Sequence, residues 1–449
     1  MFRYIMKHAK FLKSAAVMTA GFVIAKAIGA IYRISLTRTL GSYGIGLYQM
    51  AYPLFLLFLT CTSAGIPSAL SRVIAAESAR GRETTGQMRT ALRLFALIGL
   101  VGSVLMGIAA VFMSSLQQEK NLTACYLALS PSVFLCALVS VLRGYFQGKN
   151  DRLPTAVSEV VEQAVKATFG FVAAQAAESP VEGAVLALMG VSFSELIALI
   201  ILVQKYRGER KVKSLRRVKA YSLVDAVVPV MAAASLLPLS RTIDSVVVVR
   251  LMARYTGRAV ALYGLFTGGV LSLVDLPASL TGGFVAAAIP LVSSSSSKGD
   301  SETAKKNAAL ALLFTFALSV PCALGLFFFA GPVVKLLYAN LPAGDLATVI
   351  SLIRLSSISA VSLSAVNTLA ASLTGMGRAK YAARAMLAAI SVKFVLQLLL
   401  VSNPSLSVSG AAIASNACYL VAFLLDSLYT WRGPKRTKLL VGKLKSKEA

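Results

Sequence analysis

Apolar segments of about twenty residues recur along the whole chain, and an α-helix needs about twenty residues to cross the hydrocarbon core of a bilayer. Of the 449 residues, 57% are hydrophobic and only 14% are charged, whereas a soluble globular protein carries about 25% charged residues. Long apolar blocks also differ from the alternating segments of about ten residues that form transmembrane β-barrels. The sequence therefore predicts an all-α polytopic membrane protein.

The apolar runs predict about twelve transmembrane helices. The predicted spans are 13–38, 44–69, 90–115, 122–146, 155–177, 181–204, 222–249, 260–292, 306–330, 346–372, 381–402 and 408–431. When the connecting segments are assigned alternately to the two sides of the membrane, one side carries about five times as many Lys and Arg as the other. Cytoplasmic loops carry such an excess of positive charge. We therefore expect a multi-pass protein of the cell membrane with both termini in the cytoplasm.

The net charge of +27 could also indicate a nucleic-acid-binding protein. Most Lys and Arg, however, occupy short segments between predicted spans, where the topology of a membrane protein places them. We therefore expect membrane lipid, and not nucleic acid, to be the partner of these charges.

The most basic connecting segment, QKYRGERKVKSLRRVK, follows the sixth predicted span. The aligned segments FQGKNDRLPTAVSEVVEQAVK and LTGMGRAKYAARAMLAAISVK indicate a weak repeat, six helices apart, that places Lys166 on Lys393. An even number of helices between repeats predicts parallel halves related by an axis along the membrane normal. The predicted parts are an N-terminal six-helix lobe (1–204), a basic cytoplasmic linker (205–220), a C-terminal six-helix lobe (221–432) and a basic cytoplasmic tail (433–449).

Ionisable side chains lie inside several predicted spans. Each costs at least about 2.5–3.5 kcal/mol at the bilayer centre, and such groups usually face a bundle interior or a water-filled cavity that forms a substrate or ion pathway. A hydrated cavity lined by positive charge therefore explains these residues best. The predicted cationic cavity consists of Lys26, Arg33, Arg241 and Arg354.

The first predicted span carries two of these cations. Lys26 and Arg33 are seven residues apart, so they lie on one face of a helix. Gly29 lies near the same face, where it allows close approach of another helix or of a head group. Because no acidic residue shares this span, the pair predicts an anion-binding site.

Acidic residues accompany the cations of later spans. Arg241 precedes Asp244 by three residues and Glu162 precedes Lys166 by four, so each acid can pair with a cation on its own helix. Two interpretations stay open for both acids. Each either takes part in the cavity and in coupling to an ion, or serves as a structural partner of its neighbouring cation.

The eighth predicted span contains Asp275 followed by Leu276 and Pro277. Proline frees a backbone carbonyl and can bend a helix, so Pro277 is the predicted hinge. Asp275 joins Asp244 and Glu162 as a predicted cavity or coupling acid.

Residue patterns for enzymatic chemistry are missing from the sequence. The single histidine is His8 in the N-terminal tail, and there is no metal-ligand cluster, Ser/His/Asp set or phosphate-binding loop. We therefore expect no enzyme, no metal and no cofactor, and transport that is secondary or passive. The sequence leaves open whether the membrane potential, H⁺ or Na⁺ drives it.

Three segments together resemble the stage V sporulation protein B family. They are AKAIGAIYRISLTRTLGSYGIGLYQMAYPLFLLFLTCTSAGIPSALSRVIA, LRGYFQGKNDRLPTAVSEVVEQAVK and LYGLFTGGVLSLVDLPASLTGGFVAAAIPLVS. This family is part of the multidrug/oligosaccharidyl-lipid/polysaccharide (MOP) exporter superfamily, beside the peptidoglycan lipid II flippases. The resemblance covers roughly residues 10–430.

The resemblance implies two six-helix lobes that form a V around a central cavity with alternating access. It implies movement of an undecaprenyl-diphosphate-linked saccharide, either lipid II or another cell-envelope precursor, from the inner to the outer leaflet. In lipid II flippases, a first-helix arginine followed three residues later by glycine resembles Lys26 and Gly29. Their next arginine resembles Arg33, displaced by one position, and their acid before Leu-Pro resembles Asp275.

The chain also departs from the lipid II flippases. Ser272 stands where they carry an arginine three residues before the acid, and no arginine lies in the apolar part of the second predicted span. Those flippases have two further C-terminal helices, which this sequence does not predict. The departures leave the saccharide undefined.

Two other functions stay open. A cation-coupled multidrug exporter of the same superfamily would use acids to bind cationic drugs, whereas the first span here is cationic. A non-transporting scaffold for cell-wall synthesis, acting as a partner of a polymerase, would tolerate loss of the internal charges.

Overall fold

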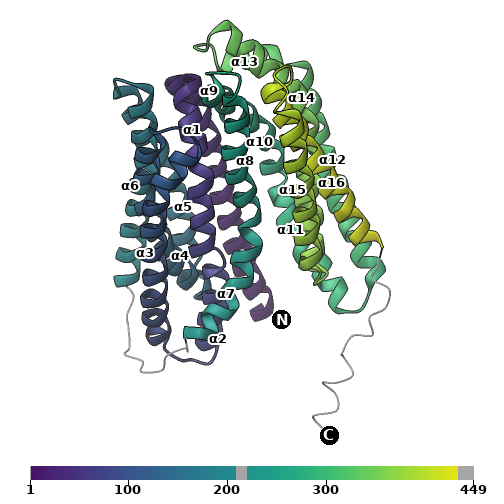
Figure 1. The fold of residues 1–449 in the computed structure, drawn as a ribbon. Helices are drawn as coiled ribbons and strands as arrows, with labels where there is room; N and C mark the ends of the chain where they lie inside the picture. Colours follow the sequence, from purple (N-terminus) through teal and green to yellow (C-terminus); the bar gives the residue numbers. More distant parts are fainter. Residues whose placement is uncertain (1, 209–219, 433–449) are drawn as a thin grey trace. The chain divides into compact units, whose positions relative to one another are not determined.

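The computed structural model describes residues 2–208 and 220–432, which form helices and turns without a strand (Figure 1). The predicted all-α polytopic membrane fold is confirmed. Most of the predicted linker and the whole predicted tail, 433–449, lie outside the described residues. The elements are α1 (Phe2–Ser63), α2 (Ile66–Ala79), α3 (Thr85–Leu116), α4 (Leu122–Gly148), α5 (Leu153–Ala176), α6 (Pro180–Arg207), α7 (Ala220–Ala234), α8 (Leu236–Ala253), α9 (Ala259–Gly264), the π-helical η1 (Leu265–Val270), α10 (Leu271–Leu280), α11 (Gly282–Ser297), α12 (Ser301–Phe328), α13 (Ala330–Leu337), α14 (Ala343–Gly375), α15 (Ala379–Leu400) and α16 (Ser407–Trp431).

Each of the twelve predicted spans falls on helix, but the count of twelve stays a prediction. Within the described ranges, nine helices are long and apolar enough to cross a membrane, or ten if the bent pair α7 and α8 is one span. The first two predicted spans merge in one candidate, Ile24–Ala79. Helix α5 is not among the nine, because Glu159, Glu162 and Lys166 interrupt its apolar run.

The helices fall into two compact units. Unit 1 comprises Met1–Leu273, Phe329–Arg354 and Leu396–Ala412. In it, α5 packs against α1 and α6, and α4 packs against α2, α3 and α6 (Figure 1). One of its apolar cores joins α2, α3, α4, α6 and α7 and contains the buried rings of Phe95 and Phe146.

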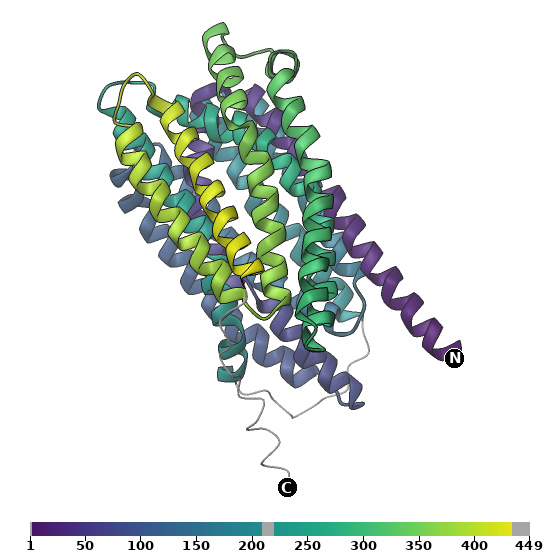
Figure 2. The same ribbon diagram turned by 90° about the vertical axis from the view of Figure 1, so that its right-hand side faces the viewer.

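Unit 2 comprises Val274–Phe328, Leu355–Val395 and Ile413–Ala449. A buried cluster formed by Val366, Ala389, Cys418 and Ala422 holds α14, α15 and α16 together, and α11 packs on α12 (Figure 2). The units are defined by compactness and not by helix count, so the two six-helix lobes remain a prediction.

Helix α1 is kinked at Gly41, whose backbone is left-handed (φ 65°, ψ −172°). A Cβ at this position would meet no atom within 4 Å, so the backbone conformation, and not lack of space, favours glycine. The kink separates the first two predicted spans, although the chain remains helical on both sides.

We expect Gly41→Ala to lower the free energy of unfolding by about 1 kcal/mol or more, because alanine is strained at positive φ. Gly344→Ala is the matched control, since its Cβ also meets open space but its backbone lies in α14 without a positive φ. Unfolding in mixed micelles measures both variants. Equal stability of the two variants would contradict the backbone explanation.

Within unit 1, helices that the sequence assigns to different lobes are in close contact. A Cβ on Gly264 of α9 would lie only 2.6 Å from the Cα of Gly46 in α1, so the two backbones touch. Nearby, Gln117 Nε2 at the end of α3 donates to Ser245 Oγ of α8 over 2.9 Å, and both side chains are buried. Small residues and buried hydrogen bonds of this kind fix helix pairs in membranes.

Two tight connections link α4, α5 and α6, and both α4 and α5 pack on α6. After α4 the chain reverses through Asn150, which adopts the left-handed conformation (φ 60°) that asparagine tolerates, and Pro154 stands in the first turn of α5. Helix α6 begins where Ser179 Oγ accepts from the N–H of Glu182 over 3.2 Å, with Pro180 next. The end of α4 therefore faces the beginning of α5.

Candidate functional site

The cationic pair of the first helix keeps its predicted arrangement. Residues 24–40 of α1 are continuously helical, so Lys26 and Arg33 share a face, with Lys26 exposed and Arg33 half-buried. Arg33 also interacts electrostatically with the hydroxyl groups of Tyr48 and Tyr338. Tyr48 and Tyr338 are buried, so the accessible part of this face consists of the two cations, which can bind an anionic, oxygen-rich group.

Gly29 is the point at which this face of α1 meets α5. A Cβ on Gly29 would lie 3.4 Å from Oε1 of Gln163, so the absence of a side chain brings the two helices close. Gln163 in turn donates from Nε2 to Glu162 Oε1 over 3.1 Å. Gln163 therefore contacts the α1 face that carries Lys26 and Arg33, and Glu162 is its neighbour in the sequence.

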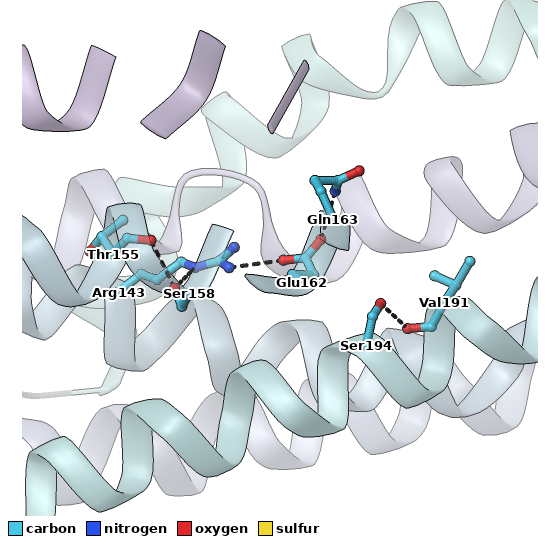
Figure 3. A network of polar contacts seen from close by, with 7 residues as sticks. All are labelled: Arg143, Thr155, Ser158, Glu162, Gln163, Val191 and Ser194. Carbon is cyan, nitrogen blue, oxygen red and sulfur yellow. Dashed lines mark hydrogen bonds and ion pairs between the residues drawn. The ribbon is translucent and has the colours of Figure 1, made fainter. Parts of the chain in front are cut away.

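Glu162 forms its ion pair with Arg143 of α4, where the sequence pointed to Lys166 of its own helix. The distance from Arg143 Nη2 to Glu162 Oε2 is 2.8 Å, and the two side chains are only 15% and 14% exposed. Arg143 Nε also donates to Ser158 Oγ over 3.0 Å. Figure 3 shows this network between the end of α4 and the first turns of α5.

The other predicted site residues lie on later helices. In α8, Arg241 and Asp244 are half-buried, and Asp244 Oδ1 accepts from Gln397 Nε2 over 2.9 Å. Tyr263 of α9 lies within electrostatic range of both, and Arg354 is exposed on α14. These residues share unit 1 with the first-helix pair, but their joint role as a cavity stays a prediction.

Asp275 and Pro277 belong to unit 2. Both lie in α10, where Asp275 is half-buried and Pro277 is buried inside the helix. The carbonyl of Asp275 accepts a hydrogen bond from Ser279 Oγ over 3.0 Å, so a side chain satisfies a carbonyl near the proline. The roles of Asp275 in coupling and of Pro277 as a hinge remain predictions.

Three buried charged groups were missing from the sequence-based site. Arg143 lies within the predicted span 122–146 and within α4, but the prediction did not assign it to the site. Glu195 of α6 and Asp426 of α16 are 6% and 1% exposed. Glu195 and Asp426 could have been found in the sequence, because each interrupts an apolar run without a cation on the same helix face.

The described part of the chain contains no group of three or more His, Cys, Asp or Glu side chains that could hold a metal ion. The predicted site residues are cations and carboxyls, of which the Glu162 carboxyl pairs with Arg143 and the Asp244 carboxyl accepts from Gln397. Such an arrangement can bind an anion on α1 and hold or release a monovalent cation among the carboxyls.

Comparisons with known proteins give the chain its relatives. Residues 11–296, well over half of the chain, match the family described as polysaccharide biosynthesis protein. Stage V sporulation protein B of Bacillus subtilis is 28% identical over 422 residues, covering 90% of this chain and 80% of that protein. Lipid II flippase MurJ of the same organism is 23% identical over 447 residues, covering 93% and 81% of the two chains.

The fold also has solved counterparts. The structure is similar to the inward-facing conformation of a multidrug resistance MATE family transporter of the MOP superfamily, with a TM-score of 0.72, 15% identity and coverage of 94% of this chain and 96% of that one. At this identity the likeness extends to the fold.

Proposed function

The chain belongs to the polysaccharide biosynthesis protein family, and from this premise we propose that it moves an undecaprenyl-diphosphate-linked saccharide from the inner to the outer leaflet by alternating access. The observation that carries the proposal is the cationic face of α1, where Lys26 and Arg33 stand in one stripe. The relation to a protein named as a lipid II flippase supports the same class of substrate.

Binding begins when the cavity is open to the cytoplasm. Lys26 and Arg33 attract the diphosphate, because charge-assisted hydrogen bonds to phosphate oxygens are among the strongest available to side chains. The polyprenyl tail stays in the surrounding lipid, where burial of its methylene groups is favourable. Arg241 and Arg354 are the further cations that we assign to this cavity.

Neutralisation of the cavity by the bound anion then allows the two lobes to change their relative arrangement. An inside-negative membrane potential favours outward movement of anions by about 2.3 kcal/mol per charge per 100 mV. The step therefore needs no nucleotide. Asp244, Asp275 and Glu162 are the acids that we assign to binding of a coupling ion.

A cation-coupled multidrug exporter is the second candidate, because the same fold occurs in a multidrug transporter. Such a protein would bind cationic drugs through exposed acids, whereas the α1 face carries two cations and no acid. Expression in drug-sensitive cells distinguishes the candidates. We expect no gain in resistance to cationic drugs.

Rescue of cells depleted of their own lipid-linked-precursor flippase tests the proposal in the cell. We expect the chain to restore growth and to relieve accumulation of the precursor in the inner leaflet. Normal insertion of the protein without relief of accumulation would contradict transport of that precursor, and repeating the assay with other polyprenyl-linked saccharides defines the substrate.

A further inference from the structure

Glu195 is a buried acid that the proposed binding site does not use. It lies in the middle of α6, only 6% exposed, among the apolar residues of that helix. Its Oε2 is buried and has no hydrogen-bond partner. A carboxylate oxygen in this position is very costly unless it carries a proton or binds a cation.

The groups around Glu195 come from the two helices packed most closely on α6. From α4, the Cys136 thiol lies beside the Glu195 carboxyl and the Arg143 guanidinium attracts it; from α5, Glu162 repels it and Lys166 attracts it. From α1, Tyr32 donates from its hydroxyl to the carbonyl of Ala187, two turns before Glu195.

Charge balance in this cluster requires a proton. Arg143 interacts with the carboxyls of Glu159, Glu162 and Glu195, and Lys166 attracts that of Glu195. With these five groups ionised, the carboxylates outnumber the cations by one, an excess that a low-dielectric surrounding disfavours. One added proton makes the cluster neutral. We expect Glu195 to hold this proton, because its Oε2 has no hydrogen-bond partner.

We propose that Glu195 binds and releases a proton during the transport cycle, and that Arg143 responds by being shared between Glu162 and Glu195. This inference rests on the proposed function. The proton comes from water and returns to water, and no covalent bond or electron transfer is involved. With Glu195 protonated, Arg143 pairs with Glu162 at 2.8 Å, as observed. With Glu195 ionised, the two carboxylates compete for one guanidinium.

The cluster is connected to the proposed substrate face through α5. Glu162 accepts from Gln163, whose Oε1 marks the closest approach to Gly29 of α1. Any shift of Glu162 caused by ionisation of Glu195 is therefore transmitted to the contact between α5 and the Lys26 stripe. This gives proton binding and anion binding a shared element, as coupling requires.

Infrared difference spectroscopy of the purified full-length protein, between acidic and alkaline buffer, tests the proton site without reference to transport. We expect the carbonyl stretch of a protonated carboxyl in the wild type, its loss in Glu195→Gln and a shifted band in Glu195→Asp. Glu178→Gln, which removes an exposed acid just before α6, should leave the band unchanged. An unchanged band in a folded Glu195→Gln variant overturns the proposal, as does an unshifted band in Glu195→Asp.

Transport by proteoliposomes supplies the second readout. We expect Glu195→Gln to reduce acceleration by an imposed pH gradient by about tenfold, within the range of ordinary coupling energies, and to leave transport without a gradient close to that of the wild type. Full retention of the gradient effect, or its replacement by a sodium gradient, overturns proton coupling at Glu195. Absence of polyprenyl-diphosphate transport in the wild type refutes the proposed function. The infrared experiment still tests protonation of Glu195 in that case, because it does not depend on transport.

Discussion

Removal of both first-helix cations, by Lys26→Ala together with Arg33→Ala, is expected to abolish leaflet transfer while the protein still inserts and folds. Each side chain would lose a charge-assisted contact with the diphosphate, worth about 1.5–3 kcal/mol. Two such losses correspond to about a hundredfold or greater decrease in binding. Stability should change little, because Lys26 is exposed and Arg33 is half-buried.

Arg38→Ala is the matched control, since it removes an exposed arginine from the same helix at a position outside the stripe. The conservative double variant Lys26→Arg with Arg33→Lys retains both charges and should retain much of the activity. Transfer is measured by extracellular labelling of the precursor, with protein level and thermal unfolding followed in parallel. Wild-type transfer by the double alanine variant would refute this binding site.

The second large effect concerns the stability of the α4 and α5 pair. We expect Arg143→Met to lower the free energy of unfolding by about 3–5 kcal/mol, because Glu162 would be left as a buried charge without its cation. Methionine preserves most of the apolar volume of the arginine stem, so the loss reports on charge and hydrogen bonds more than on packing. Reversible unfolding in mixed micelles measures the change.

The double variant Arg143→Met with Glu162→Leu is the control for this prediction. Replacement of a whole buried ion pair by apolar residues is often neutral, so the second substitution should recover most of the lost stability. A double variant as unstable as Arg143→Met alone would show that the 2.8 Å pair is not the source of the effect.

The fold could be predicted from the sequence because membrane solvation imposes a simple rule. A spanning segment must be apolar over about twenty residues and must satisfy its backbone hydrogen bonds internally. That rule located helix at every predicted span. It separated spans 13–38 and 44–69 and counted 155–177, whereas in the structure helix α1 continues on both sides of Gly41 and α5 carries three charged residues in its apolar run.

The candidate site was predictable only where one helix carries the whole pattern. Lys26 and Arg33 follow from helical spacing on α1, whereas Arg143 meets Glu162 through the turn at Asn150. The direction of that turn is a backbone property that apolar periodicity does not encode.

The most direct test of the account is leaflet transfer of a polyprenyl-diphosphate-linked saccharide by the purified chain in proteoliposomes, with an inside-negative potential imposed. Fluorescent lectin or enzymatic modification at the outer surface detects the transferred head group. We predict transfer that the potential accelerates and that Lys26→Ala with Arg33→Ala abolishes. Transfer equal to that of protein-free liposomes, from correctly folded protein and across the tested saccharides, would contradict the proposed flippase.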